Sequence, residues 1–437
     1  MNEVAVVICN YNKKDFVLGC IESVFASSFE KFDLIVVDNA STDGSAEAIR
    51  EKFADRLTLL VNEENTGGSG GFNRGMQYAM DKGVYKYIHL LDNDVVVDKD
   101  AIGELHGFME EHSDVGVCGS LILQMQHPEL IQEMGSMIVP EDFSVKLLYK
   151  NERYDSNLPE FVEADVATAC SSMYRIDILK KAGLIDKDFF IYWDDIALSW
   201  EIRLSGSKVC AISSSKVWHY ASWLSIANES LPTTYYAFRN KIRVFTKCLD
   251  DIQFNCFIDN LVERLFRMFA FHQSKSGSLL TFFHAFDDAL NEVRGKAEPG
   301  KFISQKPFSD KLRNILRSKK KAVIIPYQDC PPLYLQRLIE NIRKIVDLEI
   351  AVCEDSYVCE NELIIETCAH ILSLPELKQD RIYIDYYYNE IVDDADKDFM
   401  ADIDKHRLFF HKTFYEFTKQ KLTALRNKIR PKEWDLI

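Results

Sequence analysis

Short β-branched runs alternate with segments of helical apolar spacing over the first hundred residues. Residues 4–8, 34–37, 57–61 and 87–91 are strand-like, and residues 16–25 and a segment ending near 53 have helical spacing. This alternation predicts an α/β fold with a doubly wound, mainly parallel sheet. In such a sheet the ligand site lies beyond the carboxyl ends of the strands. The polar clusters that follow these runs are therefore candidate site residues.

A glycine-rich stretch at residues 65–75 precedes a predicted helix at 76–80. We expect a loop here, in which backbone amides together with Asn73 and Arg74 suit a phosphorylated ligand. The stretch contains neither GxxxxGK[ST] nor a well-formed GxGxxG. A P-loop nucleoside triphosphatase or a hydride-transferring enzyme is therefore not indicated.

The chain has 437 residues, of which 47% are hydrophobic, so two or more packed units are expected. We expect a catalytic domain at 1–234, a basic helical region at 235–299 and an accessory domain at 300–437. A hinge is expected near Pro299. The accessory domain is predicted to be small and either α/β or mostly helical, because a βαβ-like pattern spans 322–353 and helical spacing follows.

The net charge of −16 argues against a nucleic-acid-binding protein, whose phosphate contacts need a basic surface. The 11 cysteines form no close CxxC pair, which argues against a disulfide framework and is typical of a reducing compartment. The sequence has neither a signal-peptide pattern nor an apolar run long enough to span a membrane. We expect a cytoplasmic protein, with the inner face of the membrane as an alternative location.

Two carboxylates, Asp92 and Asp94, directly follow the apolar strand at 88–91. A divalent ion between them and a diphosphate would relieve their repulsion and neutralise a departing nucleoside diphosphate. The alternative is a solvated turn of Asp and Asn residues. The surrounding motifs favour the metal site.

Other polar residues follow further predicted strands. Asp38 suits a base imide or ribose hydroxyl and Tyr11 suits a base face, although both are also ordinary turn residues. Asp194 and Asp195 follow an aromatic segment, where one of them suits a general base, or where both simply favour a helix N-terminus. His219 is a candidate metal ligand or a structural histidine between aromatic residues.

In order and spacing, these motifs resemble glycosyltransferase family 2 over roughly residues 2–245. The motifs are VAVVICNYN from Val4, VDNASTDGS from Val37, the stretch 65–75, Asp92-Asn93-Asp94, Trp193-Asp194-Asp195 and Trp218-His219. The last two, with YYAFRN from Tyr235, are most similar to the galactofuranosyltransferases and their rhamnosyltransferase-like relatives. In the polymerising galactofuranosyltransferases an acid stands where this chain has Asn93.

The resemblance implies a GT-A fold, a nucleotide-sugar donor, usually a UDP-sugar, and Mn²⁺ or Mg²⁺. By the resemblance, Asp92, Asp94 and His219 hold the metal. Asp38 and Tyr11 contact the nucleotide. Asp195 is the base of an inverting transfer, and Asp194 orients the acceptor, a hydroxyl of a glycan, glycolipid or glycoprotein.

Two other functions stay open at this point. A sugar-phosphate nucleotidyltransferase also uses carboxylates and Mg²⁺, but the first strand is not followed by a basic, glycine-rich triphosphate site. The second is an inactive scaffold that acts through its C-terminal module.

Charge and aromatic residues also bear on assembly. The segment 235–321 is basic between two acidic segments, and it is rich in phenylalanine. We expect a homo-oligomer in which the acidic tail meets this basic segment, and peripheral contact with an anionic membrane is the alternative.

Overall fold

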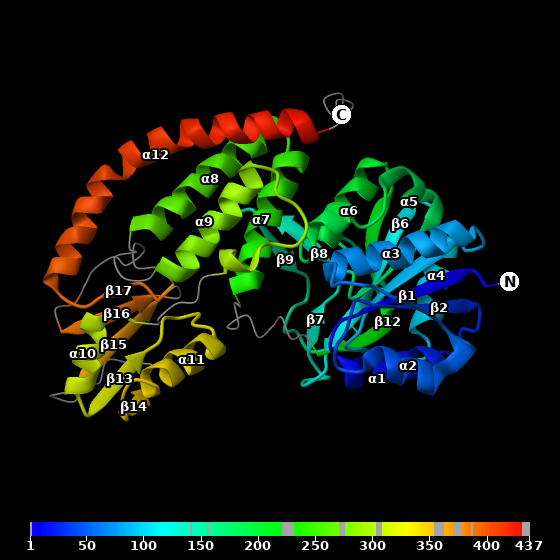
Figure 1. Ribbon diagram of the computed structural model, residues 1–437, viewed down its shortest axis with the longest axis horizontal. Helices are drawn as coiled ribbons and strands as arrows, with labels where there is room; N and C mark the ends of the chain where they lie inside the picture. The colour runs from blue at the N-terminus through cyan, green and yellow to red at the C-terminus, as the bar shows by residue number, and fades with distance from the viewer. Residues whose placement is uncertain are drawn as a thin grey trace. The chain divides into compact units, whose positions relative to one another are not determined.

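The computed structural model describes residues 2–139, 142–154, 157–220, 231–270, 276–302, 308–353, 362–369, 378, 380–385 and 388–430. The chain divides into two compact units. Unit 1 comprises Met1–Ser222, Asn240–Val244 and Val293–Ala297, and unit 2 comprises Trp223–Arg239, Phe245–Glu292 and Glu298–Ile437. Helices and strands are labelled in Figure 1.

Unit 1 is built on a ten-stranded sheet whose main order is β10-β12-β6-β11-β4-β1-β2-β3. Its strands are β1 (Val4–Asn10), β2 (Phe32–Asp38), β3 (Thr58–Val61), β4 (Tyr87–Asp92), β5 (Val95–Val97), β6 (Val115–Gln124), β7 (Ile131–Glu133), β10 (Phe161–Glu163), β11 (Ser171–Arg175) and β12 (Lys208–His219). β1 runs parallel to both β2 and β4, and β12 runs parallel to β6. β11 is antiparallel to β4 and β6. The sheet is therefore mainly parallel at its centre and mixed beyond β4.

Helices cover both faces of this sheet. They are α1 (Lys14–Phe25), α2 (Ser45–Phe53), α3 (Gly67–Lys82), α4 (Ala101–Glu111), α5 (Ile176–Ala182) and α6 (Asp194–Leu204). Alternate residues of β1 enter different cores: Val4 and Val6 pack with α1, whereas Ala5 and Val7 pack with α3. Figure 1 shows α3 and α1 on opposite sides of the strands. The predicted α/β class, with a mainly parallel sheet covered by helices on both faces, is confirmed.

The predicted glycine-rich loop is wrong, because α3 begins at Gly67 and takes up most of the stretch. Gly71 and Gly75 lie one helical turn apart on the face of α3 that meets the sheet. A Cβ on Gly71 would lie 2.1 Å from the sulfur of Cys9, and one on Gly75 would lie 2.3 Å from Val7. The glycines therefore allow close packing between helix and strand.

Two further strand-like stretches of the sequence, 133–139 and 162–173, are each interrupted in the structure. The first is divided between β7 and β8 (Ser136–Val139), where Gly135 has φ +74°. β8 pairs with β9 (Ser144–Leu147) in a separate ribbon. The second is divided between β10 and β11. The loop between them supplies Thr168 to Cys170 to the candidate site.

Unit 2 combines long helices with a small, mainly parallel sheet. The helices are α7 (Leu231–Cys248), α8 (Asp251–Ala270), α9 (Ser276–Leu290), α10 (Asp310–Ser318), α11 (Pro332–Arg343) and α12 (Asp394–Ile429). The sheet order is β14-β13-β15-β16-β17, from β13 (Lys321–Ile325), β14 (Glu349–Val352), β15 (Leu363–Cys368), β16 (Arg381–Asp385) and β17 (Glu390–Ile391). The predicted helical region and small C-terminal α/β part are both present.

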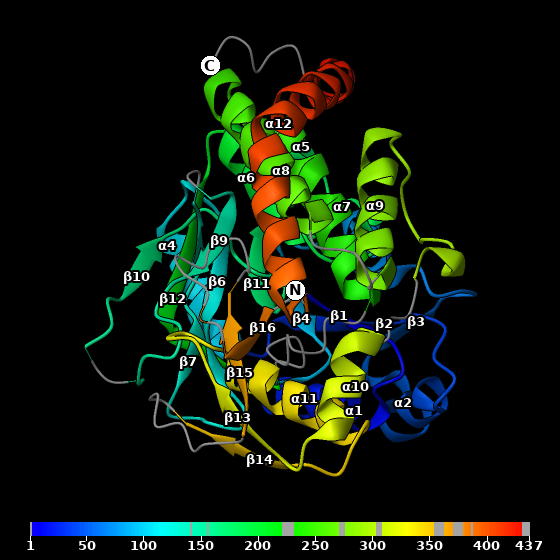
Figure 2. The same cartoon turned by 90° about the vertical axis from the view of Figure 1, so that its left-hand side faces the viewer.

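The phenylalanines expected to pair subunits are largely used inside unit 2. The ring of Phe266 lies 5.1 Å from that of Phe410, and Phe286 lies 6.1 Å from Phe414. These contacts join α12 to α8 and α9, and Figures 1 and 2 both show α12 running beside α8. Phe266, Phe282 and Phe286 are buried. Phe269 and Phe271 lie outside the described side chains. The buried aromatic residues complete the unit rather than form an exposed apolar face.

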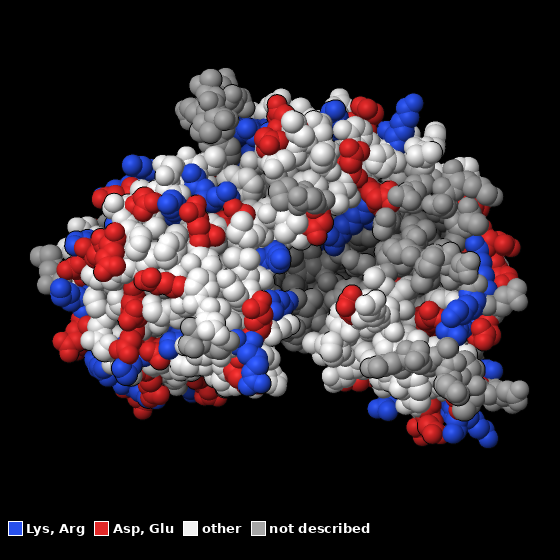
Figure 3. Space-filling model, turned by 180° about the vertical axis from the view of Figure 1, so that it is seen from behind, with Lys and Arg blue, Asp and Glu red and all other residues white. Residues whose placement is uncertain are grey.

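On the face seen in Figure 3, acidic and basic side chains are interspersed. Among the described residues, no helix is both long enough and apolar enough to cross a membrane.

Candidate active site

Strand pairing brings His219 to the carboxylates that follow β4. Asp92 ends β4, and β5 follows directly after Asp94. β5 pairs with the end of β12, so that His219 lies opposite Val95. Nε2 of His219 is 3.1 Å from Oδ1 of Asp94 and 3.7 Å from Oδ2 of Asp92. The three predicted metal ligands therefore lie together.

The middle residue of the acidic motif has a structural role. Asn93 is buried, and its side-chain amide donates to Oδ1 of Asn10 at the end of β1. Nδ2 of Asn10 in turn donates to Asp38 at 3.1 Å. These bonds join the ends of β1, β2 and β4. An amide provides the donor that this network needs, whereas an ionised acid at position 93 would provide none.

Two further residues, which the sequence did not predict, contact the acidic motif and His219. Nζ of Lys13 lies 2.7 Å from Oδ2 of Asp94. Nδ1 of His219 donates to Oε1 of Gln132 at 3.1 Å. Donation from Nδ1 directs Nε2 towards the carboxylates, as metal-binding histidines are commonly oriented. No local motif marks either residue, because tertiary pairing alone brings them here.

The charges of these groups are strongly linked. Burial tends to raise the pKa of Asp94, but the hydrogen bond and charge of His219, together with Lys13, hold it well below its usual range. Burial tends to lower the pKa of His219, but Asp94 and Asp92 outweigh it and raise that pKa. Desolvation and the charge of Asp94 raise the pKa of Asp92. The site therefore favours positive charge between the two carboxylates.

Two more buried groups line the same region. The sulfur of Cys170 lies within 4.8 Å of ligand atoms of both Asp92 and His219. Glu133 is 3% exposed and accepts a hydrogen bond from Ser136 at 2.9 Å. Burial raises the pKa of Glu133 to about 7, and the charge of Asp195 contributes. Glu133 is thus a buried titratable group next to the site.

The second acidic pair lies at the start of α6. Asp194 and Asp195 are its first two residues, directly after Trp193. Oδ1 of Asp195 accepts from the amide of Ile196 at 2.8 Å, and Oδ2 accepts from that of Ala169 at 3.3 Å. Both oxygens are thus held in place by backbone donors.

Burial raises the pKa of both carboxyl groups of this pair. For Asp194 the negative charge of Asp195 adds to the effect of burial. For Asp195 the hydrogen bonds from Ala169 and Ile196 oppose it. A carboxylate with a raised pKa is a better proton acceptor at neutral pH than an ordinary one.

The predicted nucleotide residues occupy neighbouring strand ends. Asp38 is 1% exposed and accepts from Asn10 and from the amide of Ser41. Tyr11 is 44% exposed, so its ring is open to a ligand. Asn39, next to Asp38, donates to the carbonyl of Gly67 at 2.8 Å. The first turn of α3 is thereby tied to the end of β2.

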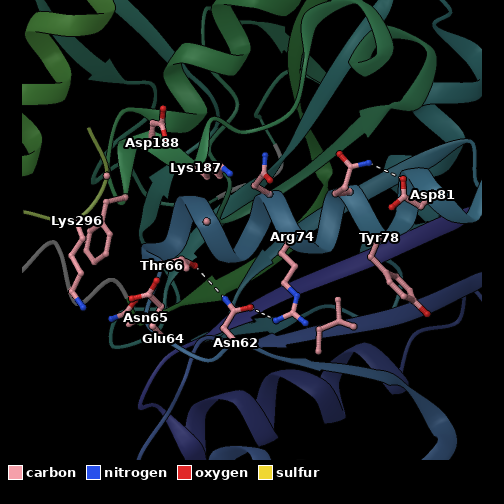
Figure 4. Close-up of a pocket in the computed structure, with 16 residues that line it drawn as sticks. Asn62, Glu64, Asn65, Thr66, Arg74, Tyr78, Asp81, Lys187, Asp188 and Lys296 are labelled. Atoms are coloured by element: carbon pink, nitrogen blue, oxygen red, sulfur yellow. Dashed lines mark hydrogen bonds between the residues drawn. The ribbon is translucent and has the colours of Figure 1, made fainter. Parts of the chain in front are cut away.

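Asn73 and Arg74 line a different pocket of about 640 Å³, shown in Figure 4. Arg74 donates to the carbonyl of Val61 at 2.8 Å and to the side chain of Asn62. Asn73 donates to the carbonyl of Ile185 at 2.6 Å. Among the residues that line this pocket are neither Asp38 nor the carboxylates of the two acidic pairs. A donor-binding role for Asn73 and Arg74 stays a prediction.

Strand ends, paired carboxylates and a buried histidine form a site suited to a metal and an anionic ligand. Comparison with known proteins shows what part of the chain is similar to. Residues 5–183 match the family model for glycosyl transferase family 2. The match spans β1 to α5, including Asp38 and the Asp92-Asn93-Asp94 motif. Asp194, Asp195 and His219 lie beyond it.

Individual known proteins and solved structures match parts of the chain. TuaG of Bacillus subtilis, named as a teichuronic acid biosynthesis glycosyltransferase, is 30% identical over 112 residues, which cover 25% of this chain and 43% of TuaG. The poly-β-1,6-N-acetyl-D-glucosamine synthase of Staphylococcus aureus is 25% identical over 207 residues, 46% of this chain and 45% of the synthase. The crystal structure of S. aureus TarS 1–349 is 17% identical, covers 66% of this chain and 80% of that one, and has a TM-score of 0.43.

The chain spans less than half the length of these two curated relatives. The family 2 match and the relatives support a glycosyltransferase. The comparisons do not single out the galactofuranosyltransferase-like subtype that the motifs predict.

Proposed function

We propose that this chain is an inverting, metal-dependent glycosyltransferase. It moves a sugar from a nucleoside diphosphate, in our proposal a UDP-hexose such as UDP-galactofuranose, to a hydroxyl of a glycan, glycolipid or glycoprotein. The observation that carries the proposal is the convergence of Asp92, Asp94 and His219 at the ends of β4 and β12. The family 2 match over residues 5–183 supports it.

The residues present fit a divalent ion. Two carboxylates and an imidazole nitrogen are ligands that Mn²⁺ accepts, and carboxylates are the ligands of Mg²⁺. Asp94 and Asp92 raise the pKa of His219, while His219 and Lys13 lower the pKa of Asp94, so these carboxylates are stabilised by positive charge beside them. When bound, Mn²⁺ or Mg²⁺ neutralises charge on the departing diphosphate. Lys13 partly offsets the charge of Asp94 in the same place.

The acidic pair at the start of α6 supplies the proton acceptor. In our proposal Asp195 takes the proton of the acceptor hydroxyl as that oxygen bonds to the anomeric carbon. The bond from the anomeric carbon to the diphosphate oxygen breaks on the opposite side, so the configuration inverts. Asp194 orients the acceptor. The backbone bonds of Asp195 keep its carboxylate directed during the transfer.

For the nucleotide, we propose that the exposed ring of Tyr11 packs on the base and that Asp38 fixes the uridine. We also keep Asn73 and Arg74 as donor-binding candidates near the first turns of α3. As partners we propose a second copy of this chain and, secondarily, an anionic membrane surface at the cytoplasmic face.

The experiment that tests this proposal is a screen of nucleotide sugars. UDP-, GDP- and dTDP-sugars are incubated with the full chain and Mn²⁺, and release of the nucleoside diphosphate is measured. We expect release from one donor class, abolished by EDTA and by Asp94→Ala, and unchanged by Glu104→Gln on the exposed side of α4. Absence of release across the panel contradicts the proposal. Pyrophosphate release from a nucleoside triphosphate and a sugar phosphate would instead indicate a nucleotidyltransferase.

A further inference from the structure

The backbone just before the acidic pair has an unusual conformation. Phe190, Tyr192 and Trp193 have φ values of 68°, 65° and 69°. Side chains other than glycine rarely occupy this left-handed region, at a cost of roughly 1–3 kcal/mol each. Three such residues among four persist only where surrounding contacts hold them. Because this segment leads directly into Asp194 and Asp195, its conformation sets the direction in which α6 presents them.

One buried amide side chain holds this segment. Nδ2 of Asn240 donates to the carbonyl oxygens of Phe189 at 3.0 Å, Ile191 at 2.8 Å and Tyr192 at 3.0 Å. Asn240 is fully buried, and it belongs to the part of α7 that groups with unit 1. Three carbonyl groups that point towards one place need a hydrogen-bond donor there. Without it their oxygens would be buried with no partner and would repel one another.

One turn later on the same helix, Arg243 contacts the start of the segment. Its guanidinium lies 2.7 Å from Oδ2 of Asp186 and 4.6 Å from the centre of the Phe189 ring. Residues three positions apart on a helix share a face. α7 therefore presents Asn240 and Arg243 together to residues 186–192.

The opposite side of the segment rests on α3. The carbonyl oxygen of Phe190 accepts from the amide of Ser69 at 3.1 Å. A Cβ on Gly67 would lie 1.9 Å from that oxygen, so the first turn of α3 approaches the segment as closely as a backbone can. The segment is thus fixed between α3 and α7.

We propose that Asn240 is a positioning residue for the acidic pair: its carboxamide, supported by Arg243, holds residues 189–193 in the conformation that directs Asp194 and Asp195 into the site. The consequence for catalysis rests on the proposed glycosyl transfer. The consequence for the backbone does not. A residue that served only to anchor α7 would affect the stability of the fold without a selective effect on turnover.

The test is Asn240→Asp, which keeps the shape of the side chain but replaces the donor by an oxygen facing three carbonyl oxygens. With the donor that the wild type hydrolyses, we expect kcat to fall at least about tenfold, because a small misplacement of catalytic groups slows the reaction strongly. The donor KM is expected to change less than about twofold. Arg243→Gln, which keeps the amide of Asn240, is expected to reduce kcat less, in the same direction. Asn255→Asp, the same change at a partly exposed asparagine on α8, is the matched control and leaves both constants unchanged.

A second readout does not depend on activity. In protein labelled with 5-fluorotryptophan, the ¹⁹F resonance of Trp193 is assigned by its loss in Trp193→Phe. We expect this resonance to shift or broaden in Asn240→Asp and in Arg243→Gln, and to stay in place in Asn255→Asp.

An unchanged Trp193 resonance and unchanged kcat in Asn240→Asp would overturn the proposal, as would an equal loss of donor binding and turnover. If Asn240→Asp does not fold, the same outcomes are scored on Arg243→Gln. A wild-type chain that hydrolyses no donor counts against the proposed function alone, because the ¹⁹F comparison still decides the role of Asn240.

Discussion

Nε2 of His219 lies 3.1 Å from Oδ1 of Asp94, although the two residues are far apart in the sequence. The pairing of β5 with the end of β12 creates this contact. It places the imidazole against a buried carboxylate, and Oδ2 of Asp92 lies 3.7 Å from the same Nε2. Two carboxylates and one imidazole that share a small volume are the core of the proposed metal site.

Asp195→Asn tests the proton acceptor. The substitution is nearly isosteric but removes the ability to take a proton from the acceptor. We expect kcat to fall at least about a hundredfold, while the dissociation constant of the donor stays within about twofold. Steady-state kinetics and calorimetric donor binding measure the two quantities. Near-normal turnover would move the role to Asp194 or elsewhere.

The pH dependence of the rate follows from the raised pKa of Asp195. A base is active only when it is deprotonated, so turnover rises with pH through the pKa of the base. Because burial raises that pKa, we expect the midpoint of the acidic limb of kcat to lie above 3.8, the ordinary value for an aspartate. A pH–rate profile at saturating Mn²⁺ measures it. An acidic limb centred at or below 3.8 would show that Asp195 is not the group that titrates.

Gly71→Ala tests the close packing of α3 on the sheet. The added Cβ would lie 2.1 Å from the sulfur of Cys9, and overpacking of this kind typically costs about 1–3 kcal/mol. Gly19→Ala is the matched control, because it lies within α1 and its Cβ would meet nothing within 4 Å. We expect Gly19→Ala to stabilise by about 0.5–1 kcal/mol. Urea unfolding measures the free energy of unfolding of both variants. Equal values for the two would refute the packing argument.

Self-association is expected to depend on charge. The aromatic rings of Phe266 and Phe286 are buried within unit 2, so they do not form an apolar interface between copies. We expect the full chain to sediment above the monomer mass at micromolar concentration and to approach that mass in 0.5 M salt, because salt screens surface charge. A monomer at low salt, pulled down by anionic liposomes, would support the membrane alternative.

The sequence predicts the arrangement of β1 to β4 well, because each strand is a short apolar run that ends in a polar residue or is directly followed by one. It predicts the stretch 65–75 wrongly. Glycine lowers helix propensity, and the tertiary reason for Gly71, contact with Cys9, is invisible along the chain. Tertiary packing overrides local propensity at this helix.

The residues of the candidate site, too, could be predicted from the sequence only in part. Asp92 and Asp94 are readable from a motif at a strand end, and so is the pair at the start of α6. Lys13 contacts Asp94, and Gln132 contacts His219. Asn240 contacts the backbone just before the second acidic pair. The YYAFRN motif contains Asn240, but its place against residues 189–192 depends on the packing of α7. Such residues become apparent only when the fold is known.

The central claim, that Asp92, Asp94 and His219 hold a divalent ion for a nucleoside diphosphate, is tested most directly by calorimetric titration of UDP. For the wild type we expect the dissociation constant of UDP to be at least about tenfold lower in the presence of Mn²⁺ than in the presence of EDTA. We expect Asp94→Ala and His219→Ala to bind equally weakly with and without Mn²⁺, while His127→Ala at the exposed surface behaves as wild type. Full Mn²⁺-dependent binding of UDP by either site variant, or wild-type binding that is indifferent to Mn²⁺, would contradict the claim.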